Sequence, residues 1–142
     1  MEPTIPLCGA CRKLVMTQED KALLLKDLYA RLPYGIKASY YGAEEECETW
    51  DEIECITLDG CVDIGQYSLP IECIKPYLFP ISSITEEQKI FLRQQKWCIA
   101  ISTSGTIETT IEGIDWLNKN HFDYRGLIEK GLAIDATGLN LY

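Results

Sequence analysis

The chain has 142 residues, of which 46% are hydrophobic and 25% are charged, a composition typical of one globular domain and unlike that of disordered chains. Its formal net charge of −9 disfavours direct binding to nucleic-acid backbones or anionic membranes and permits a basic protein partner. We find no signal peptide and no apolar run near the ~20 residues of a membrane helix, so we expect a cytoplasmic protein with its seven cysteines reduced.

The first part of the chain predicts an irregular arm at residues 1–16 and then a helix. Thr17 begins the helix with a sequence similar to a capping box, in which Asp20 stands at the position of the usual Glu or Gln. Pro33 and Gly35 end it. Between them, apolar side chains recur at helical spacing and predict one buried stripe, at Leu24, Leu25, Leu28, Tyr29 and Leu32.

The next part predicts a small sheet. Residues 36–41 resemble a strand, and residues 42–52 resemble an acidic loop. Two apolar runs flank Asp59-Gly60, which predicts a hairpin with a type I′ turn, a turn that needs positive φ at both central residues. Residues 69–74 predict a further short strand, which Pro70 places at a sheet edge.

The second half predicts two helices and short strands. A full capping box at Thr85 predicts a helix that runs to about Lys96. The remaining elements that we expect follow in chain order: a proline-bounded linker or single turn at 75–80, a strand at 97–102, a turn at 102–106, a helix at about 107–118, one helical turn at 126–130 closed by Gly131, and a short strand at 133–135.

Together these elements predict an α+β fold. We expect the N-terminal helix to pack on a small, mostly antiparallel and SH3-like sheet, followed by a helical half with short strands. Residues 1–16 are the irregular arm, and residues 17–142 form the compact domain. Its two halves, 17–74 and 81–142, either share one core or form two lobes.

Three segments resemble a known group of proteins: Lys21–Gly35, Ile74–Gln88 and His121–Ala136. The chain is similar there to small uncharacterised proteins of gut Bacteroidales genomes, many of them phage-like or carried on mobile elements. The resemblance implies an accessory protein of phage or mobile-element origin that acts inside a bacterial cell. It transfers no catalytic residue, and the arm at residues 1–16 is not part of the shared pattern.

The segment after the third helix holds the candidate ligand-binding residues. Arg125 is suited to hold a phosphate or carboxylate, and Tyr124 to stack on a ring or donate a hydrogen bond. His121, the single histidine, is suited to acid–base work near neutral pH. Asp123 and Trp116 complete this set.

The alternative for the same segment is a structural corner. Asp123 would then cap the following turn, Arg125 would pair with Asp123, and Phe122 would fill the core. The sequence locates no nucleophile elbow and no oxyanion hole beside His121.

A possible metal site lies in the N-terminal arm, where Cys8 and Cys11 form half of a zinc site. Zinc needs four ligands, so Cys47, Cys55 or His121 would have to fold nearby to complete it. A redox pair or two ordinary reduced thiols are the alternatives. Apart from this zinc we expect no cofactor.

Three functions follow from these features. The first is a non-enzymatic binding protein that acts on a host protein, for example as a counter-defence inhibitor. The second is a binder of a small nucleotide-like ligand, such as a signalling nucleotide, at the Arg125 region. The third is a hydrolase or transferase that uses His121, which requires a nucleophile or metal within reach of the ring. The sequence leaves the oligomeric state open.

Overall fold

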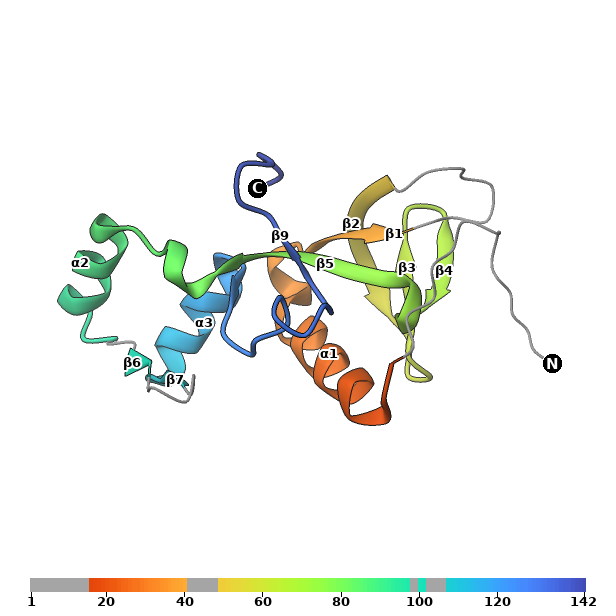
Figure 1. Ribbon diagram of the computed structural model, residues 1–142, viewed down its shortest axis with the longest axis horizontal. Coiled ribbons are helices and arrows are strands. Elements are labelled where there is room, and N and C mark those ends of the chain that lie inside the picture. The colour runs from red at the N-terminus through yellow and green to blue at the C-terminus, as the bar shows by residue number, and fades with distance from the viewer. Residues whose placement is uncertain (1–15, 41–48, 98–99, 102–106) are drawn as a thin grey trace.

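The computed structural model describes residues 16–40, 49–97, 100–101 and 107–142 and confirms the α+β class (Figure 1). An N-terminal helix lies against a mostly antiparallel sheet. Of the two further helices, one lies at the opposite end of an elongated molecule and the other lies between it and the N-terminal helix. No helix in these residues combines the length and apolar character needed to cross a membrane.

Helix α1 spans Gln18–Arg31 and begins where the sequence predicts. The Thr17 hydroxyl accepts a hydrogen bond from the Asp20 N–H at 3.0 Å and so satisfies one of the unpaired donors of the first turn. Leu24 and Leu28 are fully buried against the sheet. A 3₁₀ turn, Leu32–Tyr34, follows and ends at Gly35, whose φ is +79°.

The sheet is built around five strands: β1 (Lys37–Tyr40), β2 (Thr49–Ile56), β3 (Cys61–Ile64), β4 (Tyr67–Pro70) and β5 (Ile74–Pro80). They lie in the order β4-β3-β2-β1-β5 with antiparallel neighbours, and a 3₁₀ turn, Ile71–Cys73, joins β4 to β5. This is the strand order of SH3-like barrels. Strand β4 occupies the edge, as its proline predicts.

Three sequence predictions for this region need correction. The acidic loop expected at 42–52 is wrong for residues 49–52, which belong to β2, and its other residues lie outside the described part of the chain. The segment 71–73 is helical and not extended. The Asp59-Gly60 hairpin exists, but φ is positive only at Gly60 (+89°), and the Gly60 N–H donates to the Thr57 carbonyl at 3.1 Å. This is a type I turn with a glycine bulge, which needs one positive φ and not the two of a type I′ turn.

The prediction of a linker at residues 75–80 is wrong, because this segment is β5 (Figure 1). It pairs antiparallel with β1 at one end, and parallel with β8 (Phe122–Asp123) and β9 (Ile134–Asp135) at the other. Pro76 pairs with Ala38 without an N–H of its own, and the Phe79 N–H donates to the His121 carbonyl at 2.8 Å. The two prolines of this segment argued against a strand in the sequence, yet the segment is a strand that pairs with three others.

The second half contains a 3₁₀ turn, Ile81–Ser83, and two helices, α2 (Glu86–Gln94) and α3 (Ile111–Lys119). The capping box at Thr85 is confirmed. Helix α3 starts later than predicted, because Thr110 is its N-cap and residues 107–108 form β7, paired with β6 (Ala100–Ile101). The described part of the strand expected at 97–102 is limited to β6, and the turn expected at 102–106 lies outside the described residues.

The hydrophobic core draws on both halves of the chain. Leu24 and Leu28 of α1 belong to one buried cluster with Val62 and Ile64 of β3 and with Leu127, which lies beyond β8. Each fully buried Leu or Ile contributes about 1.5–3 kcal/mol relative to the exposed side chain. The segment after β8 is therefore part of the core that covers α1 and not an appendage to it.

Candidate functional site

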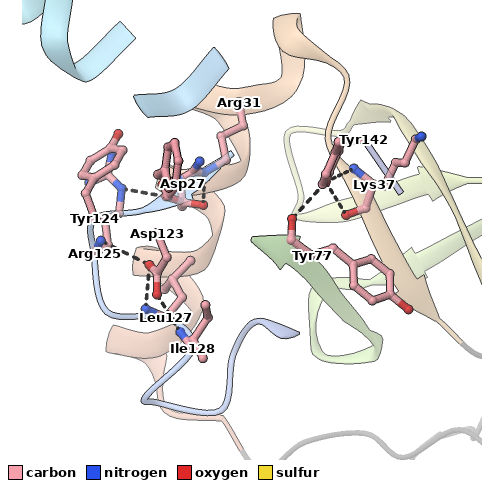
Figure 2. A network of polar contacts seen from close by, with 11 residues as sticks. Asp27, Arg31, Lys37, Tyr77, Asp123, Tyr124, Arg125, Leu127, Ile128 and Tyr142 are labelled. Carbon is pink, nitrogen blue, oxygen red and sulfur yellow. Dashed lines mark hydrogen bonds and ion pairs between the residues drawn. The ribbon is translucent and has the colours of Figure 1, made fainter. Parts of the chain in front are cut away.

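A buried charge network joins α1 to the segment after α3 (Figure 2). Arg31 donates to Asp27 through Nε (2.7 Å) and Nη2 (3.1 Å), and both side chains have no exposed surface. Arg31 Nη2 also donates to the Phe122 carbonyl at 2.6 Å, and Arg125 Nε donates to Asp27 Oδ1 at 3.0 Å. The Asp27 carboxylate thus accepts from two guanidinium groups, that of Arg31 on the same helix and that of Arg125, 98 residues further along the chain.

Tyr124 lies beside both guanidinium groups. The Cζ atoms of Arg31 and Arg125 lie 5.3 and 4.8 Å from its ring centroid, and Arg125 Nη2 donates to its hydroxyl at 3.1 Å. Cation–π contacts of this length stabilise by about 0.5–2 kcal/mol. Arg125, the predicted phosphate ligand, therefore directs two of its nitrogens to partners within the protein.

Asp123 caps the turn that follows it. Its Oδ1 accepts from the Leu127 N–H at 3.0 Å and from the Arg125 N–H at 3.3 Å, and its Oδ2 accepts from the Ile128 N–H at 2.9 Å (Figure 2). This is the capping geometry of the structural-corner alternative. One detail of that alternative is wrong: the Arg125 side chain forms its ion pair with Asp27 and not with Asp123.

His121 occupies a different environment. It follows the end of α3 with a φ of +65°, a left-handed conformation that is unusual for a residue other than glycine. His121 is 8% exposed, and its ring nitrogen Nδ1 is buried with no hydrogen-bond partner among the described residues. An unpaired buried polar atom costs about 1–3 kcal/mol, so this nitrogen lowers the stability of the folded chain.

The His121 ring stacks on Tyr142, with ring centroids 3.6 Å apart and an interplanar angle of 17°. Tyr142 is itself held in place: its hydroxyl accepts from the Lys37 N–H and donates to the Tyr77 carbonyl, each at 2.9 Å (Figure 2). The Lys37 ammonium donates to the Leu141 carbonyl. The last residues of the chain therefore fix one wall beside His121.

The electrostatic environment keeps His121 neutral. Desolvation, with a smaller contribution from the positive charges of Arg31 and Lys37, lowers its pKa from 6.5 to about 4. At neutral pH the ring offers one N–H donor and one acceptor nitrogen and carries no charge. It is therefore a hydrogen-bonding group there and not a cationic one.

A cavity of about 500 Å³ opens beside this ring. Its walls carry three further rings, Phe79, Phe122 and Tyr142, and polar side chains from the 3₁₀ turn Ile81–Ser83, from α2 and its N-cap, from α3 and from the C-terminal segment. Among the described residues that line it, Lys119 is the one with a charged side chain. The volume falls within the range of small-molecule sites.

A second pocket of about 280 Å³ shares Lys119 with the first and is also lined by Trp116. It also includes Tyr34, Phe91 and Trp97, with Glu112 and Asp115 at the same pocket. The predicted ligand-binding set is thus divided. His121 lines the first cavity and Trp116 the second, while Asp123, Tyr124 and Arg125 line neither of them.

Backbone strain coincides with these two pockets. In the described part of the chain, the non-glycine residues with positive φ are Lys96, His121 and Asn140. Lys96 immediately precedes Trp97 of the second pocket, and Asn140 lies two residues before Tyr142 of the first. Strained residues gather at functional sites more often than elsewhere, which favours both pockets as sites.

Sequence reasoning missed most of the first cavity. Lys119 and Tyr142 carry no local motif. Lys119 ends α3 two residues before His121, whereas Tyr142 reaches the ring through the hydrogen bonds that its hydroxyl makes at Lys37 and Tyr77. The predicted zinc ligands Cys8 and Cys11 lie outside the described residues, and within those residues no group of His, Cys, Asp and Glu side chains is arranged to hold a metal ion.

The chain matches no protein-family model, no curated protein and no solved structure. Its function must therefore be argued from its own side chains.

Proposed function

We propose that the protein binds a small anionic ligand with a planar ring, such as a nucleotide, in the His121 cavity. The observation that carries this proposal is the buried, unpaired Nδ1 of His121 beside a cavity of about 500 Å³. A ligand that turned the imidazole toward the cavity and supplied a hydrogen-bonding partner to Nδ1 would offset the cost of leaving that nitrogen unpaired.

The lining supports this class of ligand. Lys119 brings a positive charge, and no carboxylate side chain is among the described residues that line the cavity, although the whole chain has a net charge of −9. Phe79, which is half-buried, offers an aromatic ring against which a planar ring can pack. An anion therefore meets local attraction in a protein that repels it elsewhere.

The same lining favours binding over catalysis. The hydroxyl groups of Ser83 and Thr137 donate to Pro80 and Asp135, and the Thr85 hydroxyl accepts the capping bond from Gln88. Within the described residues, none of these three hydroxyls is hydrogen-bonded to His121 as an activated nucleophile would be. A hydrolase or transferase that uses His121 is therefore the weaker proposal.

A thermal-shift panel of mono-, di- and cyclic nucleotides tests the proposed function. We expect at least one nucleotide to raise the Tm, and Lys119→Ala to reduce that shift because it removes the cationic side chain of the cavity. Lys130→Ala is the matched control, because Lys130 is exposed and does not line the cavity. Absence of a shift with every nucleotide, or an equal loss in both variants, would overturn the proposal.

A second candidate function is binding to a host protein, for example as a counter-defence inhibitor. The net charge of −9 favours a basic partner, and the second pocket combines aromatic rings with two carboxylates. This candidate needs no ligand in the His121 cavity, so the two functions can be tested separately.

A further inference from the structure

The second pocket presents aromatic side chains from three parts of the chain. Tyr34 comes from the 3₁₀ turn after α1, Phe91 from α2, and Trp116 from α3. Trp97, which follows α2, meets Phe91 edge to face, with ring centroids 5.9 Å apart and an interplanar angle of 79°. Tyr34 and Phe91 are 37% and 41% exposed, so the rings are accessible from solvent.

The position of Trp97 is set by a left-handed residue. Lys96, with a φ of +65°, donates its N–H to the Arg93 carbonyl, and Trp97 donates its N–H to the Leu92 carbonyl at 2.9 Å. This pair of hydrogen bonds is a Schellman motif, in which glycine normally holds the left-handed position. The chain accepts strain at Lys96 in the conformation that turns Trp97 back beside Phe91.

Acidic side chains stand on the same face of α3 as Trp116. Glu112 and Asp115 are exposed, and their spacing from Trp116 and Lys119 places all four on one side of the helix. Lys119 contributes one positive charge against the two carboxylates, so the pocket has a net negative charge. Aromatic faces combined with carboxylates suit a cation, which gains from the ring quadrupoles and from ion pairing.

We propose that this pocket binds an arginine side chain presented by a basic segment of a partner protein. The inference rests on the second candidate function and names its contact site. Arginine fits best because its planar guanidinium stacks on aromatic rings and pairs with carboxylates through two parallel hydrogen bonds. A volume of about 280 Å³ suits one long side chain better than a nucleotide-sized ligand.

The indole N–H signals of the chain provide a direct test. The protein has three tryptophans, and Trp50 lies on β2, away from the pocket residues. We would titrate the full chain with a short Gly/Ser peptide that contains one arginine and follow the three indole signals by ¹H–¹⁵N NMR, assigned with Trp→Phe variants. We expect saturable shifts of Trp97 and Trp116, with Trp50 unchanged.

Two controls make the result specific. The same peptide with citrulline, which keeps the planar shape without the charge, should leave the signals unmoved. Glu112→Gln combined with Asp115→Asn should weaken binding about five-fold or more, because it removes both carboxylates. No shift with the arginine peptide, an equal response to citrulline, or an equal shift of Trp50 would overturn the proposal.

The tests distinguish a failure of this pocket proposal from a failure of the other proposals. If a host partner is captured equally by the natural chain and by Phe91→Ala, the host-protein function stands and this pocket is not its contact site. If the arginine peptide binds and no nucleotide raises the Tm, the His121 proposal fails while the pocket proposal stands.

Discussion

The imidazole ring of His121 lies 3.6 Å, centroid to centroid, from the phenol ring of Tyr142, in a nearly parallel stack. The phenol hydroxyl is bound to the backbone at Lys37 and at Tyr77, so the stack ties the end of α3 to β1 and β5. His121 is buried by this arrangement and loses most of its tendency to take up a proton. Its titration is therefore linked to the folding of the chain.

Stability should decrease as the pH falls from about 6.5 to about 4. The folded pKa of His121 is about 4, below the unfolded value of 6.5, so in this window the unfolded chain binds a proton that the folded chain does not. Between pH 7 and pH 4.5 the loss from this group is about 2 kcal/mol. Urea unfolding at the two pH values measures it.

The matched variant is His121→Asn, because asparagine tolerates positive φ and does not titrate in this window. The carboxylates titrate in both proteins, so the difference between the two pH profiles isolates His121. An identical acid loss in both proteins would show that His121 does not carry the effect.

Breaking the buried ion pair should cost far more than breaking an exposed one. Asp27→Asn removes the carboxylate charge that faces Arg31 and Arg125, and we expect a loss of about 3–5 kcal/mol. Lys89→Gln removes the exposed pair with Glu86 on α2 and should cost about 0–1 kcal/mol. Urea unfolding measures both, and similar losses would contradict the assigned role of Asp27.

The cap formed by Asp123 should be important for stability. Asp123→Ala leaves the buried Leu127 N–H without its acceptor, at a cost of about 1–3 kcal/mol. Asp135 makes a comparable bond to the Thr137 N–H at the surface, and Asp135→Ala should cost less than about 1 kcal/mol because water replaces the acceptor. Thermal unfolding of the two variants measures this difference, and equal losses would argue against the cap as the cause.

Replacing Lys96 by glycine should stabilise the protein. The left-handed backbone at Lys96 is strained for a lysine and unstrained for glycine, so we expect a gain of about 0.5–1 kcal/mol. Asn140→Gly is the control, because asparagine already tolerates its φ of +57°. A higher Tm for Lys96→Gly alone is the expected result, and a lower one would show that the lysine side chain itself contributes to stability.

The sequence predicted the beginnings of the first two helices well because a cap is a local signal. Thr17 and Thr85 each accept from an N–H three residues later, and all of the information lies within four residues. The Asp59-Gly60 hairpin was predictable for the same reason, although its turn type was not. The sequence placed the start of α3 too early because Ile107 lies four residues before Ile111 and so continues the helical spacing.

Strand β5 could not be predicted from its own residues. Pro76 and Pro80 argue against a strand, and only the partners β1, β8 and β9, distant in sequence, make the pairing possible. The candidate site was misjudged for a related reason. In an extended segment His121, Asp123 and Arg125 would share one face, but the left-handed backbone at His121 and the turn after Asp123 interrupt the alternation, so the three side chains enter different environments.

The three-partner arrangement of β5 bears on the order in which this molecule can acquire its structure. The earlier segments α1 and β1 are completed by later segments of the chain, since Arg31 bonds to the carbonyl of Phe122, 91 residues further on. Such long-range closure slows folding and postpones it during synthesis. A nascent chain that ends after β5 would hold Arg31 and Asp27 without their later partners, so this part of the core could close only after the segment from Phe122 to Arg125 had been made.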